Sequence, residues 1–133
     1  MHAPMLLLVD DQADVRFLLG LFLRDAGYAF EEATDSEAGL AAARTGAYDL
    51  VLLDQQMPPG PTGIDVAETL RAEGHAGPIV LYSAFLEPSV AVRAGAVGVV
   101  TVPHGEPDLV VDAVRAELGP AGARRAGRAV AAS

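Results

Sequence analysis

Five short apolar runs alternate along the chain with amphipathic stretches of helical spacing. Most of the runs lack a polar–apolar alternation, which is typical of strands that are buried on both faces. The runs comprise residues 5–9, 28–33, 50–53, 79–82 and 97–102. The stretches that follow them predict helices over residues 12–26, 35–44, about 63–73, 88–94 and 108–118. Together they predict an α/β fold, a doubly wound parallel sheet covered by helices on both faces.

Length and charge narrow the class of protein further. At 133 residues the chain fits one domain. The acidic side chains number 18 against 9 basic ones, for a net charge of −9, and every basic residue is arginine. This charge argues against direct binding of nucleic acid, which needs clustered cations, and favours a small protein or a metal ion as partner. No run is long enough to span a membrane or to act as a signal sequence, so we expect a cytoplasmic protein.

The chain changes composition after residue 119. Residues 120–133 are rich in Ala, Gly and Arg and contain no acid. The pair Gly119-Pro120 should end the last helix, because proline cannot continue it. We therefore expect a folded domain over 1–119 and a flexible or weakly helical tail over 120–133.

Polar side chains follow the predicted strands where each strand ends. They are Asp10, Asp11, Asp54, Ser83 and His104. In doubly wound folds these ends meet at one edge of the sheet, which is where ligands bind. Close carboxylates repel each other, and Mg²⁺, which prefers carboxylate oxygens, would relieve the repulsion. A carboxylate beside Mg²⁺ can attack a phosphoryl group, and Ser83 is placed to donate a hydrogen bond to it.

Four segments give the chain a specific resemblance. They are VDD near the N-terminus, LLDQQMPPGPTG after the third predicted strand, LYSA after the fourth and AGAVGVVTVP before the last helix. In this order they resemble the response regulator receiver family of two-component signalling, over roughly residues 5–118. The resemblance implies a flavodoxin-like (βα)5 fold with strand order 2-1-3-4-5.

The resemblance also implies roles for individual residues. The first acidic pair, Asp10 and Asp11, would bind Mg²⁺ together with Asp54 and the backbone carbonyl of Gln56. Asp54 would accept the phosphoryl group from a histidine kinase or a phosphotransfer protein. Ser83 would contact that group through its hydroxyl, and a downstream protein partner would read the result. Met57-Pro58 fits the family's loop after the acceptor.

The chain departs from the family pattern on its C-terminal side. The family's lysine before proline falls on Val102, and its aromatic switch residue falls on Val99. The acceptor loop is about one residue longer than usual, and the segment over 83–95 about three residues shorter, which predicts a curtailed fourth helix. His104 and, more weakly, Arg93 are candidates to replace the lysine. We expect slow phosphorylation and an atypical output.

These features leave several functions open. The first is a single-domain response regulator that is phosphorylated on Asp54 and signals by protein–protein interaction, since the chain ends at Ser133. The second is a pseudo-receiver that binds partners without phosphorylation. A metal-dependent hydrolase is a third reading, but Gln56 stands where such enzymes commonly place a second aspartate. We expect no enzyme activity beyond slow autodephosphorylation. Dimer formation is possible, and the sequence favours no surface for it.

Overall fold

The computed structural model describes residues 4–103 and 105–119. A sheet of five parallel strands runs in the order β2-β1-β3-β4-β5. The strands are β1 (Met5–Val9), β2 (Ala29–Ala33), β3 (Leu50–Asp54), β4 (Ile79–Ser83) and β5 (Val100–Pro103). The helices are α1 (Ala13–Asp25), α2 (Ser36–Ala43), α3 (Gly63–Ala72), α4 (Pro88–Ala96) and α5 (Pro107–Leu118).

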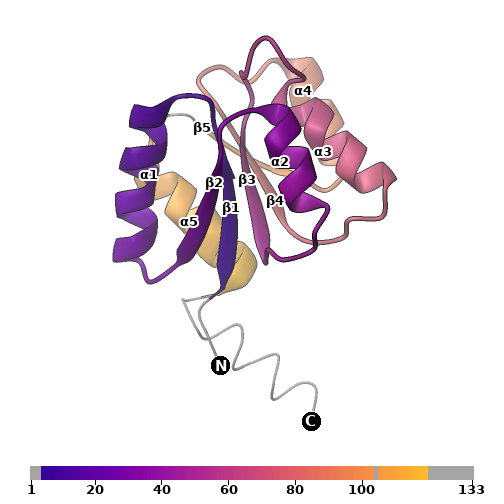
Figure 1. The fold of residues 1–133 in the computed structure, drawn as a ribbon. Coiled ribbons are helices and arrows are strands. Elements are labelled where there is room, and N and C mark those ends of the chain that lie inside the picture. Colours follow the sequence, from indigo (N-terminus) through magenta and orange to yellow (C-terminus); the bar gives the residue numbers. More distant parts are fainter. Residues whose placement is uncertain (1–3, 104, 120–133) are drawn as a thin grey trace.

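The helices form two layers around the sheet. Helices α1 and α5 lie together on one face, and α2, α3 and α4 cover the other (Figure 1). The doubly wound fold and the strand order 2-1-3-4-5 that the sequence predicted are therefore confirmed. Because all strands are parallel, their carboxyl ends meet at one edge of the sheet, which we call the carboxyl edge.

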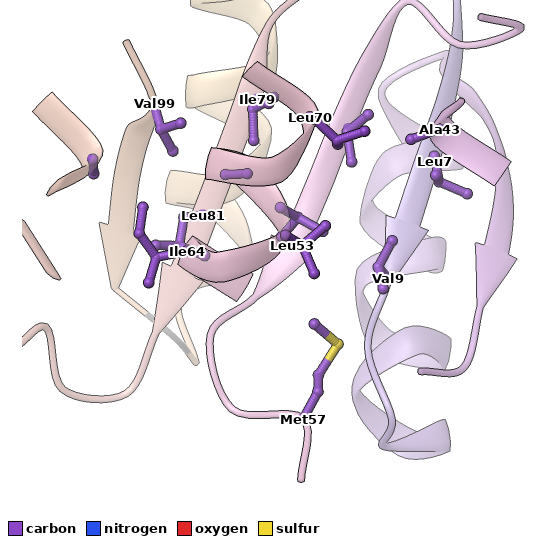
Figure 2. Packing of buried hydrophobic residues seen from close by; sticks show 14 of the residues in the cluster. Leu7, Val9, Ala43, Leu53, Met57, Ile64, Leu70, Ile79, Leu81 and Val99 are labelled. Carbon is purple, nitrogen blue, oxygen red and sulfur yellow. The ribbon is translucent and has the colours of Figure 1, made fainter. Parts of the chain in front are cut away.

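Each face of the sheet carries its own hydrophobic cluster. Alternate residues of the central strands point to opposite faces, so Leu53 packs under α2–α4 and Leu52 packs under α1 and α5. Figure 2 shows the first cluster, with Leu53 and Leu81 from the sheet beside Ile64 of α3. Met57 points into this cluster from the loop after β3 and is only 2% exposed. This buried side chain ties the loop to the core.

The fifth strand and the fourth helix differ from their predicted ranges. The sequence predicted a strand over 97–102, whereas β5 begins at Val100 and includes Pro103. Helix α4 continues to Ala96, two residues beyond the predicted end, and Gly98 then turns the chain with a φ of 67°. Valines lie on both sides of Gly98, at positions 97, 99 and 100, so the apolar pattern placed the start of the strand too early.

Arg71, in the last turn of α3, joins the amino ends of two strands. Its guanidinium donates hydrogen bonds to the carbonyl oxygens of His75 and Gly77, which precede β4. It also donates to those of Val97 and Gly98, which precede β5. One side chain therefore fixes the amino ends of both β4 and β5.

Two expectations concern residues whose placement is not described. His104 and the tail over 120–133 lie outside the described residues. Helix α5 ends at Leu118, and Gly119 has a positive φ of 77°. No helix within the described residues is both long enough and apolar enough to cross a membrane.

Candidate functional site at the carboxyl edge

Three carboxylates meet at the carboxyl edge of the sheet. Asp10 and Asp11 follow β1, and Asp54 is the last residue of the adjacent strand β3. One carboxylate oxygen from each lies within 4.8 Å of the other two. Asp10 and Asp54 are 0% and 5% exposed, whereas Asp11 is exposed to solvent. We call these three residues the acidic cluster.

Hydrogen bonds hold Asp10 in one orientation. Its Oδ1 accepts a bond from the backbone N–H of Gln12 at 2.8 Å. Its Oδ2 accepts a bond from the hydroxyl of Tyr82, on β4, at 2.7 Å. The Nη1 of Arg16 donates to the backbone carbonyl of Asp10 at 2.7 Å, and its Nε pairs with Glu32. The carboxylate is therefore fixed before any ligand binds.

The surroundings of Asp54 change its acidity. Burial, as the largest cause, and the charge of Asp10 together raise the pKa of Asp54 to about 7. The backbone N–H of Gln56, which points to Oδ1 at 3.4 Å, acts against this shift. A carboxyl group whose pKa is near 7 exchanges its proton easily at neutral pH. Its ionised form is costly unless a cation shares the site.

The donor set of the acidic cluster fits a magnesium ion. Hard carboxylate oxygens from three residues are close enough to share one cation, and the exposed Asp11 leaves a side open to water. Mg²⁺ keeps several of its waters and needs only a few protein ligands. The repulsion that raises the pKa of Asp54 is the kind of strain that a divalent ion relieves.

The loop after β3 is held by several side chains. The buried Oε1 of Gln55 accepts a bond from the N–H of Ile64, at the start of α3, at 2.8 Å. Ser36 donates through its hydroxyl to the carbonyl of Pro61 at 2.5 Å. Thr62 caps α3 in a capping box with Asp65. These bonds set the backbone at Gln56, whose exposed position borders the acidic cluster.

Ser83, the predicted phosphoryl contact, lies at the end of β4. It is 4% exposed and is the neighbour of Pro103 in the sheet. Its hydroxyl donates to the carbonyl of Phe85 at 2.7 Å. Ser83 is thus beside the acidic cluster, with its donor engaged by its own loop.

Apolar residues occupy the two positions at which the resemblance led us to expect a lysine and an aromatic residue. Val102 is half-buried in β5 and is the neighbour of Tyr82 in the sheet. Val99 is 7% exposed and packs in the cluster under α4. Arg93, a weak candidate to replace the lysine, instead forms ion pairs with Asp65 and Glu68 of α3.

Tyr82 is the site residue that sequence reasoning missed. Its side chain is 1% exposed, and burial together with the charge of Asp10 holds the pKa of its hydroxyl well above the usual value. The hydroxyl therefore remains a donor. In the sequence Tyr82 is one more residue of an apolar strand. The available signal was that Tyr82 directly precedes Ser83, near the end of β4. Tyr82 pairs in register with Asp54, so both side chains lie on the same face of the sheet.

Comparisons with known proteins agree with this geometry. In sequence, the chain is 40% identical over 79 residues to the transcriptional regulatory protein ResD of Bacillus subtilis, a match that covers 59% of this chain and 32% of ResD. It is 35% identical over 116 residues to the DNA-binding response regulator MtrA of Mycobacterium tuberculosis, covering 85% of this chain and 50% of MtrA. The chain thus matches between a third and a half of the length of these relatives.

Structural similarity points the same way. The chemotaxis protein CheY4 of Vibrio cholerae superposes with a TM-score of 0.77 and 26% identity, covering 86% of this chain and 98% of that structure. The sequence model of the response regulator receiver domain matches residues 6–114. Receiver domains are phosphoryl-accepting signalling modules rather than conventional enzymes. The chain therefore belongs to the response regulator receiver domain family.

Proposed function

We propose that the chain accepts a phosphoryl group on Asp54 and passes the signal on by protein–protein interaction. The observation that carries this proposal is the acidic cluster, in which a buried carboxylate with a raised pKa lies beside two further carboxylates. Three mutually repelling acids at one edge of a sheet destabilise the fold unless a cation offsets their charge.

Asp54 acts as the nucleophile in this proposal. One of its carboxylate oxygens forms a bond to phosphorus, and the bond from phosphorus to the donor's leaving group breaks with its electron pair. The leaving group is the imidazole of a histidine kinase or phosphotransfer protein, or acetate from acetyl phosphate. The product is an aspartyl phosphate, and slow hydrolysis would return the free carboxylate.

The remaining residues bind and orient the reactants. Asp10, Asp11, Asp54 and the backbone carbonyl of Gln56 would hold Mg²⁺, which when bound neutralises charge on the phosphoryl oxygens. The fixed orientation of Asp10 supports its role as a ligand. Ser83 would contact the phosphoryl group after its hydroxyl leaves the carbonyl of Phe85, a rotation about a single side-chain bond.

A specific observation favours a second function, that of a pseudo-receiver that binds partners without phosphorylation. Val102 and Val99 are apolar and packed against the strands, so neither can supply a cation or an aromatic switch. Loss of one charged donor at a reaction centre costs about 10²–10³ in rate. Phosphorylation of Asp54 would then be slow, and partners would bind the surface of the unphosphorylated protein.

A protein partner suits the charge of the chain better than a nucleic acid, because the net charge is −9. By their names ResD is a transcriptional regulatory protein and MtrA is a DNA-binding response regulator, and this chain matches only part of each. A cytoplasmic location stays a prediction from the sequence.

Intact-protein mass spectrometry tests the two functions directly. The purified protein is incubated with Mg²⁺ and acetyl phosphate, with Asp54→Ala and a sample containing EDTA in parallel. An adduct with the mass of HPO₃ on the wild type alone supports phosphoryl acceptance. Absence of the adduct, under conditions that label CheY4 and with a candidate kinase as second donor, overturns it in favour of the pseudo-receiver.

A further inference from the structure

Tyr82 brings a hydrogen-bond donor into a site made of carboxylates. Its ring packs in the cluster under α1 and α5, beside Leu19 and Val110, where a purely apolar side chain would pack equally well. Its hydroxyl reaches past this cluster and donates to Oδ2 of Asp10 at 2.7 Å. The acceptor of this buried hydroxyl is therefore a carboxylate of the acidic cluster rather than a backbone carbonyl.

The register of the sheet places Tyr82 in the middle of the reacting edge. Asp54 of β3 is its neighbour on one side, and Val102 of β5 is its neighbour on the other. Neighbours in register point to the same face of a parallel sheet, so the three side chains share the face that α1 and α5 cover. Tyr82 thus lies in register between the proposed acceptor and Val102, and its hydroxyl reaches across the strand of Asp54 to Asp10.

In the described part of the chain, no cationic side chain forms an ion pair with the acidic cluster. Across residues 4–103 and 105–119, none of the ion pairs involves a residue of the acidic cluster. Arg16 approaches most directly, yet its guanidinium binds the backbone carbonyl of Asp10 and the carboxylate of Glu32. Tyr82 is the side-chain donor that the structure places on a carboxylate of the acidic cluster.

We propose that the hydroxyl of Tyr82 is a positioning donor for phosphoryl transfer to Asp54, in place of the cation that Val102 cannot supply. Before the reaction it holds the carboxylate of Asp10 in place. During transfer of the phosphoryl group it stabilises negative charge at that carboxylate. A neutral donor preorganised in a buried site can do this because it needs no reorientation during the reaction. The inference rests on the proposed function of Asp54.

The test compares labelling rates with acetyl phosphate and Mg²⁺ in four proteins. Tyr82→Phe removes the hydroxyl and keeps the ring. Tyr28→Phe is the matched control, because Tyr28 is 2% exposed and its hydroxyl donates to the carbonyl of Gly119, away from the acidic cluster. The fourth protein combines Tyr82→Phe with Val102→Lys, which brings an ammonium group to the neighbouring strand. Mg²⁺ affinity is measured on each by calorimetry.

We expect Tyr82→Phe to label at least about tenfold more slowly than wild type, because one donor at a reaction centre is lost. Its Mg²⁺ affinity should fall by less than its labelling rate, since the ligand atoms remain and only the orientation of Asp10 is loosened. Tyr28→Phe should label like wild type. Addition of Val102→Lys should raise the rate again, because the ammonium group supplies a charged donor on the neighbouring strand of a folded protein.

Other outcomes overturn the proposal. Equal labelling of Tyr82→Phe and wild type would leave Asp54 as acceptor and dismiss Tyr82. A loss of Mg²⁺ affinity equal to the loss of rate would assign Tyr82 to metal binding alone. A slow variant that lysine at position 102 does not recover would assign the loss to packing. Failure of the wild type itself to label would overturn the proposed function and this inference with it.

Discussion

The two halves of the carboxyl edge are built from different chemistry. Around β1 and β3 the edge carries the exposed Asp11 and the buried Asp10 and Asp54, and hydrogen bonds hold Asp10 in place. Around β4 and β5 it carries Val102 and the exposed Phe85, which line a hollow that also includes Ser83 and Thr101. The first half is suited to binding a cation and an anion, whereas the second is suited to contact with another apolar surface.

This difference separates two tasks that a signalling domain must perform. The β1–β3 half would accept the phosphoryl group, and the β4–β5 half would meet the partner. If the separation holds, a substitution in one half should leave the task of the other half unchanged. Two residues of β4 connect the halves, because the hydroxyl of Tyr82 donates to Asp10 and Ser83 is the proposed contact of the phosphoryl group.

Removal of a carboxylate should have the largest effect. We expect Asp10→Asn to weaken Mg²⁺ binding by at least about 10- to 100-fold, because a charged ligand is lost from the acidic cluster. Calorimetric titration with Mg²⁺ measures this directly. Asp14→Asn is the matched control, since Asp14 is an exposed acid in the first turn of α1. Equal affinity in Asp10→Asn and wild type would contradict a metal site at this edge.

Asp54→Asn should stabilise the metal-free protein at alkaline pH. The pKa of Asp54 is raised to about 7 from 3.8, so the folded state binds its proton more tightly than the unfolded state. The resulting penalty develops as pH rises above about 4 and is complete above about 7. Allowing for solvent screening, we expect Asp54→Asn to gain about 1–2 kcal/mol over wild type at pH 8.

Urea unfolding in EDTA at several pH values measures this gain. The advantage of Asp54→Asn should shrink as pH falls from 8 toward 5, because the wild-type carboxyl then keeps its proton in the folded state. Saturating Mg²⁺ should also reduce it, since the ion stabilises the folded wild type by mass action. A gain that is the same at every pH would refute the assignment to the charge of Asp54.

Substitution on the β4–β5 half should have the smallest effect on chemistry. Phe85 is 72% exposed, so Phe85→Ser should change the free energy of unfolding by less than about 0.5 kcal/mol. Its rate of labelling by acetyl phosphate should match that of wild type. Val92, on α4, is 73% exposed, and Val92→Ser is a second variant that replaces an exposed apolar side chain. Slower labelling in either variant would show that the two halves are coupled.

The sequence predicted the β1–β3 half better than the β4–β5 half for a physical reason. Asp10, Asp11 and Asp54 interrupt apolar runs, so the end of each strand and the polar group there are visible together. Tyr82 interrupts nothing, because an aromatic residue suits a buried strand, and only the register of the sheet reveals what its hydroxyl contacts. The start of β5 was misplaced because Val97 and Val99 are apolar for the sake of helix and turn packing.

Arg71 gives the fold a mechanical asymmetry. By binding four carbonyls before β4 and β5, it clamps these strands at the end remote from Asp54. Tyr28 does the same for the end of α5 through Gly119. We therefore expect a displacement that starts at the acidic cluster to be smallest near Arg71, which acts as the pivot. It should be largest in the loops after β4 and β5. Hydrogen exchange should accordingly be slowest around the pivot and should quicken toward Phe85.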